Sequence, residues 1–191
     1  MDFDIKSYFS DHMDVLQKTE RSASHDIIAV SKKIAEVIDQ GGTIFWCGNG
    51  GSAADSQHLA AEFVGKFKND RRPLRSIALS TDSSILTCIS NDYSFQDVFA
   101  RQISALGRPN DLLVGISTSG KSANVINAIE AANDCGLHTI GLTGGDGGTL
   151  KQSADHSIIV PSTSTARIQE MHILIGHIIC DMVEILLGLR N

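Results

Sequence analysis

The sequence predicts an α/β fold, a three-layer αβα sandwich in which two layers of helices enclose a five-stranded parallel sheet. Short apolar runs alternate with helical patterns along the chain, and several runs stop at glycine or hydroxyl residues. This alternation favours parallel strands covered on both faces, because each crossover places a helix on the sheet. The length of 191 residues and the 42% hydrophobic content fit a single domain over residues 1–191.

Five apolar runs are the candidate strands. Turn signals such as Gly41-Gly42 and Cys135-Gly136 mark points where a helical stretch gives way to a strand. The glycine cluster at 144–148 is expected to be a tight turn rather than a binding site. The predicted strands are Thr43–Cys47, Arg75–Leu79, Leu112–Ile116, His138–Leu142 and Ser157–Val160.

Both ends of the chain are predicted to be helical. Two stretches within residues 1–40, at Asp4–Glu20 and His25–Gln40, precede the first strand, and we expect them to pack outside the sheet or against another subunit. The segment Thr165–Leu189 is apolar on most sides, so we expect it in an oligomer core, with packing on the sheet as the alternative. Its expected apolar positions are Met171, Ile175, Ile178, Met182 and Ile185, widened by Ile179 and Leu186.

The composition argues against several classes of protein. A formal charge of −6 without a basic run disfavours nucleic-acid binding. No apolar run reaches the roughly 18 residues of a transmembrane helix, and the acidic N-terminus does not resemble a signal peptide. The 4 cysteines are scattered without a Cys-x-x-Cys pair, which favours buried, reduced thiols in the cytoplasm over disulfides or a zinc ribbon.

The segment Gly115–Ser122 carries the clearest sign of a ligand site. It joins the end of a predicted strand to a helix that is expected to begin near Ala123. A helix start offers unpaired backbone N–H groups and the positive end of the helix dipole, and both favour phosphate. The hydroxyl groups of this turn belong to Ser117, Thr118, Ser119 and Ser122.

A second glycine-rich turn, at 47–52, follows the first predicted strand. Its spacing is not that of a dinucleotide-binding loop, because Ala53 occupies the third glycine position. Glycines let the backbone approach a ligand closely, and the alternative is a strained turn in which Ser52 caps the next helix. Together the two turns predict a phosphorylated, hydroxyl-rich ligand. The candidate sugar-binding residues here are Asn49, Gly50, Gly51 and Ser52.

Two pairs of polar residues on predicted helices suggest a metal or acid–base site. His58 and Glu62 share one helix face, so they suit a divalent metal, or Glu62 as a base beside an imidazole; a surface pair is the alternative. Gln169 and His177 interrupt an apolar segment, which is costly unless they are paired. These two are separated by about 12 Å of helix rise, so both reach one ion only with stretched geometry or from different subunits. His172 is expected to pack or to support the site.

These motifs together resemble the sugar isomerase (SIS) domain and, within that family, the phosphoheptose isomerases. The resemblance covers nearly the whole chain. The hydroxyl turn marks the SIS domain broadly, whereas the two helical pairs are specific to the subfamily. The matching segments are Cys-Gly-Asn-Gly-Gly-Ser at 47–52, His-x-x-x-Glu at 58–62, Asn-Asp at 91–92, Gly-Ile-Ser-Thr-Ser-Gly-x-Ser at 115–122 and Arg-Ile-Gln-Glu-x-His at 167–172, followed by His177.

The resemblance implies a flavodoxin-like SIS fold and a cytoplasmic homotetramer with sites shared between subunits, acting on neither nucleic acid nor membrane. It implies one zinc ion per subunit, held by His58, Glu62, Gln169 and His177. It also implies isomerisation of sedoheptulose 7-phosphate to D-glycero-D-manno-heptose 7-phosphate through an enediol, for lipopolysaccharide core, capsule or another glycoconjugate, with Glu62 and His177 catalytic. The implied substrate contacts are Asn49, Gly50, Gly51, Ser52, Glu62, Asn91, Asp92, Ser117, Thr118, Ser119, Ser122 and Gln169.

Two positions depart from the family pattern. Lys66 replaces an arginine that is frequent after the glycine, and Ser164 stands where an acidic residue is common; both bear on which heptose phosphate is used. Two other functions stay open. One is a non-catalytic relative that binds a replication initiator or another protein, which the retained metal and acid–base residues disfavour. The other is an isomerase for a different sugar phosphate.

Overall fold

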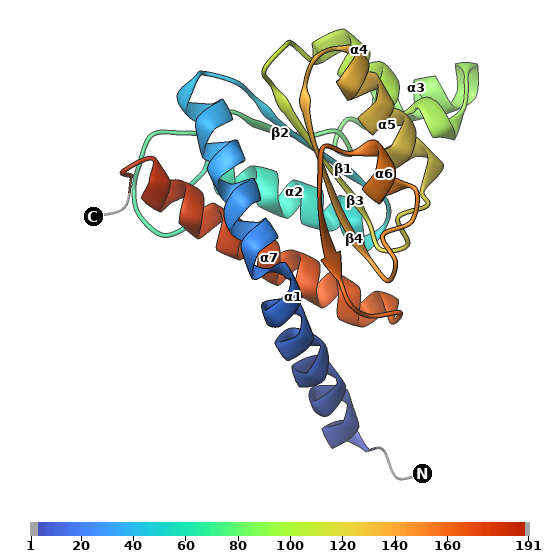
Figure 1. Ribbon diagram of the computed structural model, residues 1–191. Coiled ribbons are helices and arrows are strands. Elements are labelled where there is room, and N and C mark those ends of the chain that lie inside the picture. Colours follow the sequence, from blue (N-terminus) through green and yellow to red (C-terminus); the bar gives the residue numbers. More distant parts are fainter. Residues whose placement is uncertain (1–3, 190–191) are drawn as a thin grey trace.

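The computed structural model describes residues 4–189 as a single five-stranded sheet flanked by helices (Figure 1). All neighbouring strands are parallel, in the order β2-β1-β3-β4-β5. The five predicted strands are confirmed, with ends that differ by at most two residues. The strands are β1 (Ile44–Gly48), β2 (Ser76–Ala78), β3 (Leu112–Ser117), β4 (His138–Gly144) and β5 (His156–Val160).

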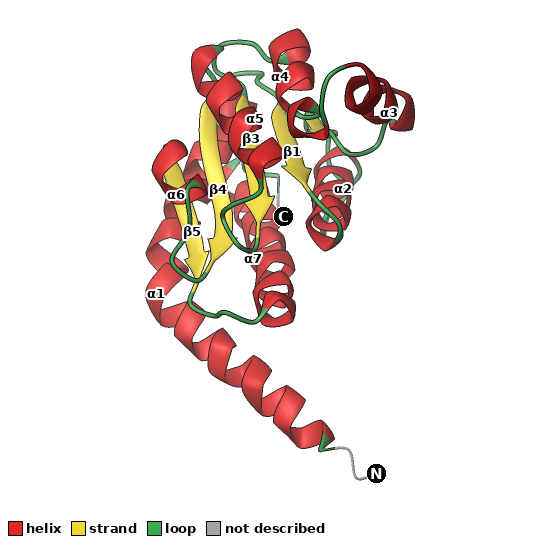
Figure 2. Ribbon diagram, turned by 90° about the vertical axis from the view of Figure 1, so that its right-hand side faces the viewer, coloured by secondary structure: helices red, strands yellow, loops and turns green. Residues whose placement is uncertain are grey.

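Helices cover both faces of the sheet, which confirms the predicted αβα sandwich (Figure 2). Alternate residues of each strand face opposite layers, as strand geometry requires: Trp46 packs in one apolar cluster and Phe45 in the other. One layer holds α1 (Ile5–Asp39), α2 (Gly51–Val64) and α7 (Thr165–Leu186). The other holds α3 (Ser83–Asp92), η1 (Phe95–Asp97), α4 (Ala100–Leu106), α5 (Ala123–Asp134) and α6 (Leu150–Ser153).

The strand order places two loops next to each other at one edge of the sheet. β1 pairs with β3, and their last paired residues are Gly48 and Ile116. The chain then leaves β1 toward α2 on one face and leaves β3 toward α5 on the other face. A reversal of this kind in a parallel sheet opens a crevice at the carboxyl ends of the strands, where ligands of such folds bind.

The expectation of two N-terminal helices is wrong, because α1 is one continuous helix of 35 residues. No glycine or proline interrupts residues 20–25. The hydroxyl groups of Thr19, Ser24 and Ser31 each bond the carbonyl four residues earlier, so they do not break the helix. The first half of α1 extends beyond the body of the protein (Figure 1), with Ile5 and Phe9 exposed.

The buried stripe of α7 agrees with the predicted one in part, because Met171, Ile175 and Ile179 are buried as expected. Ile178 and Ile185, two of the expected positions, are 38% and 51% exposed. Two stripes at three- and four-residue spacing run along a helix that is apolar on most sides, and sequence periodicity does not choose between them. The second stripe stays open at the surface of the single chain. The buried stripe is Ile168, Met171, Ile175, Ile179 and Val183.

The cysteines follow the prediction in part. All 4 thiols are free, and Cys47 and Cys180 are buried. The expectation of burial is wrong for Cys88, which is exposed on α3, and Cys135 is only half-buried at the end of α5. Among residues 4–189, no helix combines the length and apolarity of a bilayer span.

Candidate active site

Helices α2 and α7 run side by side in the same direction, and this packing assembles the candidate metal group. Gly51 approaches the side chain of Gln169 at one end of the contact. Further along, Gly176 lies against Leu59, and a Cβ at Gly176 would stand 2.5 Å from a Leu59 methyl carbon. The absence of a side chain at Gly176 therefore lets the two helix backbones approach closely.

The close approach brings His58, Glu62 and His177 together. The Nε2 atoms of the two histidines are 2.9 Å apart, and Oε1 of Glu62 lies 3.4 Å from Nε2 of His58. One donor atom from each of the three residues lies within 4.8 Å of the others. The group is accessible to a ligand, because the side chains of His58 and Glu62 are 48% and 25% exposed.

The chemistry of this donor set fits a catalytic divalent metal. Two imidazoles and one carboxylate are the protein ligands of many catalytic zinc sites, which keep a fourth position open. Tetrahedral bonds of about 2.0–2.1 Å separate ligand atoms by roughly 3.3 Å. The two separations that involve His58, 2.9 and 3.4 Å, lie on either side of that value. The third separation, between Glu62 and His177, is at most 4.8 Å, so the three side chains lie close enough to share one ion after a small adjustment.

Gln169, the fourth predicted ligand, lies elsewhere in the same chain. Its amide packs at Gly51, seven residues before His58 on α2. Seven residues correspond to about 10 Å of helix rise, so Gln169 does not join the ion position of its own chain. It lies instead at the start of α2, next to the loops at the carboxyl edge of the sheet.

The predicted phosphate turn forms the expected strand–turn–helix. Helix α5 begins at Ala123, and no side chain caps its start. The hydroxyl groups of Ser117 and Ser122 lie 2.9 Å apart across the turn, and Ser119 Oγ accepts the N–H of Lys121. We call residues 117–122, which include Thr118, the serine loop. Its uncapped helix start and its hydroxyl groups supply donors for an anion.

The glycine turn at 144–148 supports the serine loop, a role that the sequence did not indicate. Gly120 has φ of +63°, and a Cβ there would lie 2.1 Å from the carbonyl oxygen of Gly147. The N–H of Leu150 also donates to the carbonyl of Gly120. Only glycine fits at this crossing of two backbones, so the two turns hold each other in place.

The other glycine-rich turn is bound to the serine loop by an amide pair. Asn49 and Asn124 exchange two hydrogen bonds of 2.8 Å, one in each direction. Sequence reasoning missed Asn124, although a polar residue two positions after the serine loop was a signal for it. Gly50 precedes α2 with φ of +56°, and Ser52 is buried within the first turn, so the alternative of Ser52 as the helix cap is wrong.

Comparison with known proteins agrees with this geometry. A sequence profile of the SIS domain matches residues 7–144. A phosphoheptose isomerase of Roseiflexus sp. (strain RS-1) is 52% identical over 90% of this chain and 87% of its own length. One of Helicobacter pylori (strain Shi470) is 49% identical over 94% of both chains. This chain belongs to the phosphoheptose isomerase family.

Solved structures of phosphoheptose isomerases share the fold of this family member. The structure from Neisseria gonorrhoeae has a TM-score of 0.90 at 44% identity and covers 94% of this chain and 96% of its own. The structure from Francisella tularensis has a TM-score of 0.91 at 37% identity, with 94% and 95% coverage. The resemblance, the fold and the aldose–ketose isomerase class expected from the sequence are therefore confirmed.

Two predicted substrate contacts of this phosphoheptose isomerase lie apart from the metal group. Asn91 donates to Asp92 at the C-terminal end of α3, and the other oxygen of Asp92 accepts from the thiol of Cys88. Asp92 raises the pKa of that thiol. Within residues 4–189 these hydrogen bonds do not connect the pair to the serine loop, so their part in substrate binding stays a prediction.

Sequence reasoning also missed three residues beside the metal group of this isomerase. Asp55 precedes His58 by one turn, and burial raises the pKa of its carboxyl group. The ring of Phe67 stacks on His177, with centroids 5.4 Å apart. Arg71 reaches the end of α2 from the following loop. The position of Asp55 on the His58 face was a usable signal, whereas the loop residues carry no local pattern.

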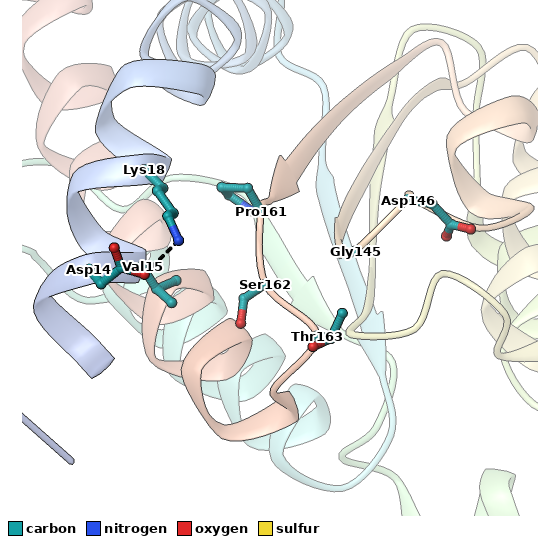
Figure 3. A pocket seen from close by; sticks show the side chains of 8 residues that line it. All are labelled: Asp14, Val15, Lys18, Gly145, Asp146, Pro161, Ser162 and Thr163. Carbon is teal, nitrogen blue, oxygen red and sulfur yellow. Dashed lines mark hydrogen bonds and ion pairs between the residues drawn. The ribbon is translucent and has the colours of Figure 1, made fainter. Parts of the chain in front are cut away.

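A hollow of about 740 Å³ lies away from the metal group of this isomerase (Figure 3). It is an open hollow lined by α1 and the loops after β4 and β5, and Lys18 bonds Asp14 at its edge. None of the predicted site residues lines it, so within one chain it does not belong to the candidate site.

Proposed function

We propose that this isomerase interconverts sedoheptulose 7-phosphate and D-glycero-D-manno-heptose 7-phosphate, with Glu62 as the base and His177 as its acid–base partner. The observation that carries the assignment of roles is the meeting of Glu62 with two imidazoles from helices far apart in the sequence. The family supplies the class of reaction and of substrate. The serine loop supplies a place for the phosphate, at the start of α5.

The proposed reaction moves one proton between neighbouring carbons. Glu62 removes the proton from the carbon beside the carbonyl, an enediol forms, and the proton returns to the former carbonyl carbon. His177 carries protons between the two substrate oxygens. Oε1 of Glu62 faces His58, so its other oxygen is left for the proton. Positioned acid–base groups of this kind contribute on the order of 10²–10⁴-fold to the rate. A bound zinc ion polarises a carbonyl and stabilises developing negative charge.

The distance between the two parts of the site favours sharing between subunits. The serine loop lies by the start of α2 through the Asn49–Asn124 pair, and Glu62 lies eleven residues after Gly51. That separation is about 16 Å of helix rise. A seven-carbon chain with its phosphate extends about 10 Å, at the bond advance of an extended peptide. We therefore propose that the serine loop and Gln169 of one subunit meet the metal group of another, within a homotetramer.

Mixing of inactive variants tests the shared site. One variant carries Glu62→Gln, and the other carries Ser119→Ala with Ser122→Ala. After subunit exchange, verified by native mass spectrometry, mixed oligomers contain sites in which both halves are intact. We expect activity to return on mixing, while each variant taken alone through the same exchange stays inactive. Verified exchange without recovered activity contradicts the shared site.

A direct assay tests the activity and the metal together. Purified protein is stripped with a chelator, supplied with sedoheptulose 7-phosphate, and followed by NMR for the aldose product, with and without added zinc. We expect turnover that depends on zinc and a lower thermal midpoint after stripping, because the ion binds only the folded chain. Absence of the aldose under all conditions contradicts the proposed function.

Three further parts of the proposal have indirect support. The proposal that residues 1–191 form one domain is supported by the single sheet, which carries both apolar clusters. The tetramer is supported by the second, exposed apolar stripe of α7 and by the exposed start of α1. The cytoplasm is supported by the 4 free cysteines. Use of the product for surface polysaccharide stays a prediction.

A further inference from the structure

A buried ion pair joins the loop after α2 to helix α7. The guanidinium of Arg71 donates from Nε to Oε1 of Glu184 over 2.8 Å. The two side chains are only 3% and 1% exposed. Burying an ion pair rarely stabilises a protein more than apolar residues of the same size would, because both charges lose their water. An ion pair in this place therefore calls for a role beyond stability.

The Arg71 side of the pair holds the C-terminal end of α2. Its Nη2 donates to the carbonyl of Glu62 over 2.7 Å, and its Nη1 donates to the carbonyl of Phe63 over 2.7 Å. The last carbonyls of a helix lack partners within the helix, and the negative end of the dipole attracts a cation. Arg71 thus fixes the backbone of Glu62, the proposed base.

The Glu184 side of the pair holds the ring that packs on His177. Oε1 of Glu184 also accepts the backbone N–H of Phe67, over 3.1 Å. The Phe67 ring stacks on the imidazole of His177 with an interplanar angle of 30°. Lys68, next in the chain, pairs with Asp181 over 2.9 Å and keeps the loop on α7. Glu184 thus fixes the position of the Phe67 ring that stacks on the imidazole of His177.

We propose that Arg71 and Glu184 are positioning residues that set the separation and orientation of Glu62 and His177. The Arg71–Glu184 ion pair fixes Glu62 through its backbone carbonyl and His177 through the Phe67 ring. The proposed base and its acid–base partner are therefore positioned by the same ion pair. This inference rests on the proposed roles of Glu62 and His177. Both side chains of the pair are buried and therefore closed to a substrate, so loss of the pair should lower kcat and leave KM for the sugar phosphate unchanged.

The test compares Arg71→Lys with Phe67→Leu and with the double variant. Lysine keeps the charge but lacks the planar fork that spans Glu184 and two carbonyls. Leucine keeps an apolar contact but removes the stacked ring. The control is Arg72→Lys, at an exposed arginine next in the chain. Each protein is measured for thermal midpoint, for kcat and KM, and, after metal removal, for the ring signal of His177 by NMR, assigned by its loss in His177→Gln.

We expect kcat to fall about tenfold in each single variant, with KM within about twofold of wild type. The double variant should be no slower than the slower single variant, because both changes remove the same support. The His177 signal should shift in both variants and stay in place in Arg72→Lys. If Arg71→Lys does not fold, Glu184→Gln replaces it in the same comparison.

Two results overturn the inference. One is an unchanged His177 signal in a folded Arg71→Lys or Glu184→Gln variant, which leaves the ion pair with a structural role only. The other is a double variant whose loss in kcat is the product of the single losses. If the wild-type protein shows no isomerase activity, the proposed function fails, and the NMR comparison still decides whether the ion pair orients His177.

Discussion

The serine loop and the metal group of this isomerase are built in different ways. The serine loop is a run of consecutive residues between β3 and α5, and a neighbouring turn fixes its backbone. The metal group comes from side chains 119 positions apart, on two helices that meet at a glycine. The proposed anion site therefore depends on local backbone shape, whereas the proposed catalytic site depends on the distance between packed helices.

The largest expected effect is the loss of the proposed base. Glu62→Gln keeps the shape of the side chain but removes its capacity to accept a proton. We expect kcat to fall by about 10²–10⁴-fold, the contribution of a positioned general base. Steady-state kinetics with sedoheptulose 7-phosphate measures this, and binding of inorganic phosphate to the serine loop should not change.

The control for this variant is Glu130→Gln, on the exposed face of α5. It removes the same charge from another helix and should keep full activity. A Glu62→Gln enzyme that turns over at a rate near wild type assigns the proton transfer to another group.

The next prediction tests the contact between α2 and α7 with a substitution that changes none of the candidate metal ligands. Gly176→Ala places a methyl group 2.5 Å from the Leu59 side chain, so α2 and α7 must separate. We expect a loss of about 1–3 kcal/mol in the free energy of unfolding, as for other overpacked sites. The affinity for zinc, measured by competition with a chelator, should fall as His177 moves away from His58.

A second substitution makes this result specific. Leu59→Ala removes the side chain that the new methyl group would meet. The double variant should therefore bind zinc more tightly than Gly176→Ala alone. Equal zinc affinity of Gly176→Ala and wild type contradicts the dependence of the metal group on helix separation.

The corresponding test of the serine loop is Gly120→Ala. The new Cβ would overlap the carbonyl of Gly147, and a residue other than glycine is strained at φ of +63°. We expect KM for the sugar phosphate to rise about tenfold, the equivalent of about 1.4 kcal/mol. Zinc affinity should stay within about twofold of wild type. A parallel loss of zinc affinity would mean that the two regions are not independent.

The contrast between a site built from consecutive residues and one built by helix packing explains what the sequence predicts and what it does not. The five strands and the serine loop follow from local apolar runs and turn residues, and the structure confirms them. The pairing of His58 with Glu62 follows from helix spacing, but their meeting with His177 rested on a family resemblance. Arg71 and Phe67 lie in an irregular loop, and only the folded chain brings them to Glu62 and His177. In α7, apolarity on most sides hid which stripe is buried.

The smallest expected effect concerns a histidine of α7 that takes no part in the proposed chemistry. His172 is fully buried, and burial lowers its pKa from 6.5 to about 4. Its Nε2 donates to the carbonyl of Thr143, and within residues 4–189 its Nδ1 has no hydrogen-bond partner. The folded protein therefore keeps the ring neutral, while the unfolded chain takes up a proton below pH 6.5.

The stability that comes from this neutral ring is complete above pH 6.5 and declines as the pH falls toward 4. Between pH 6.5 and 5.5 we expect a loss of about 1 kcal/mol, measured by urea unfolding of metal-free protein. His172→Met removes the titrating group and should flatten the pH dependence, whereas His25→Gln, at an exposed position of α1, should not. Equal slopes for wild type and His172→Met would assign the acid sensitivity to other groups. The expected slope would show that α7 carries two kinds of histidine, an accessible one at the metal group and one held neutral by packing.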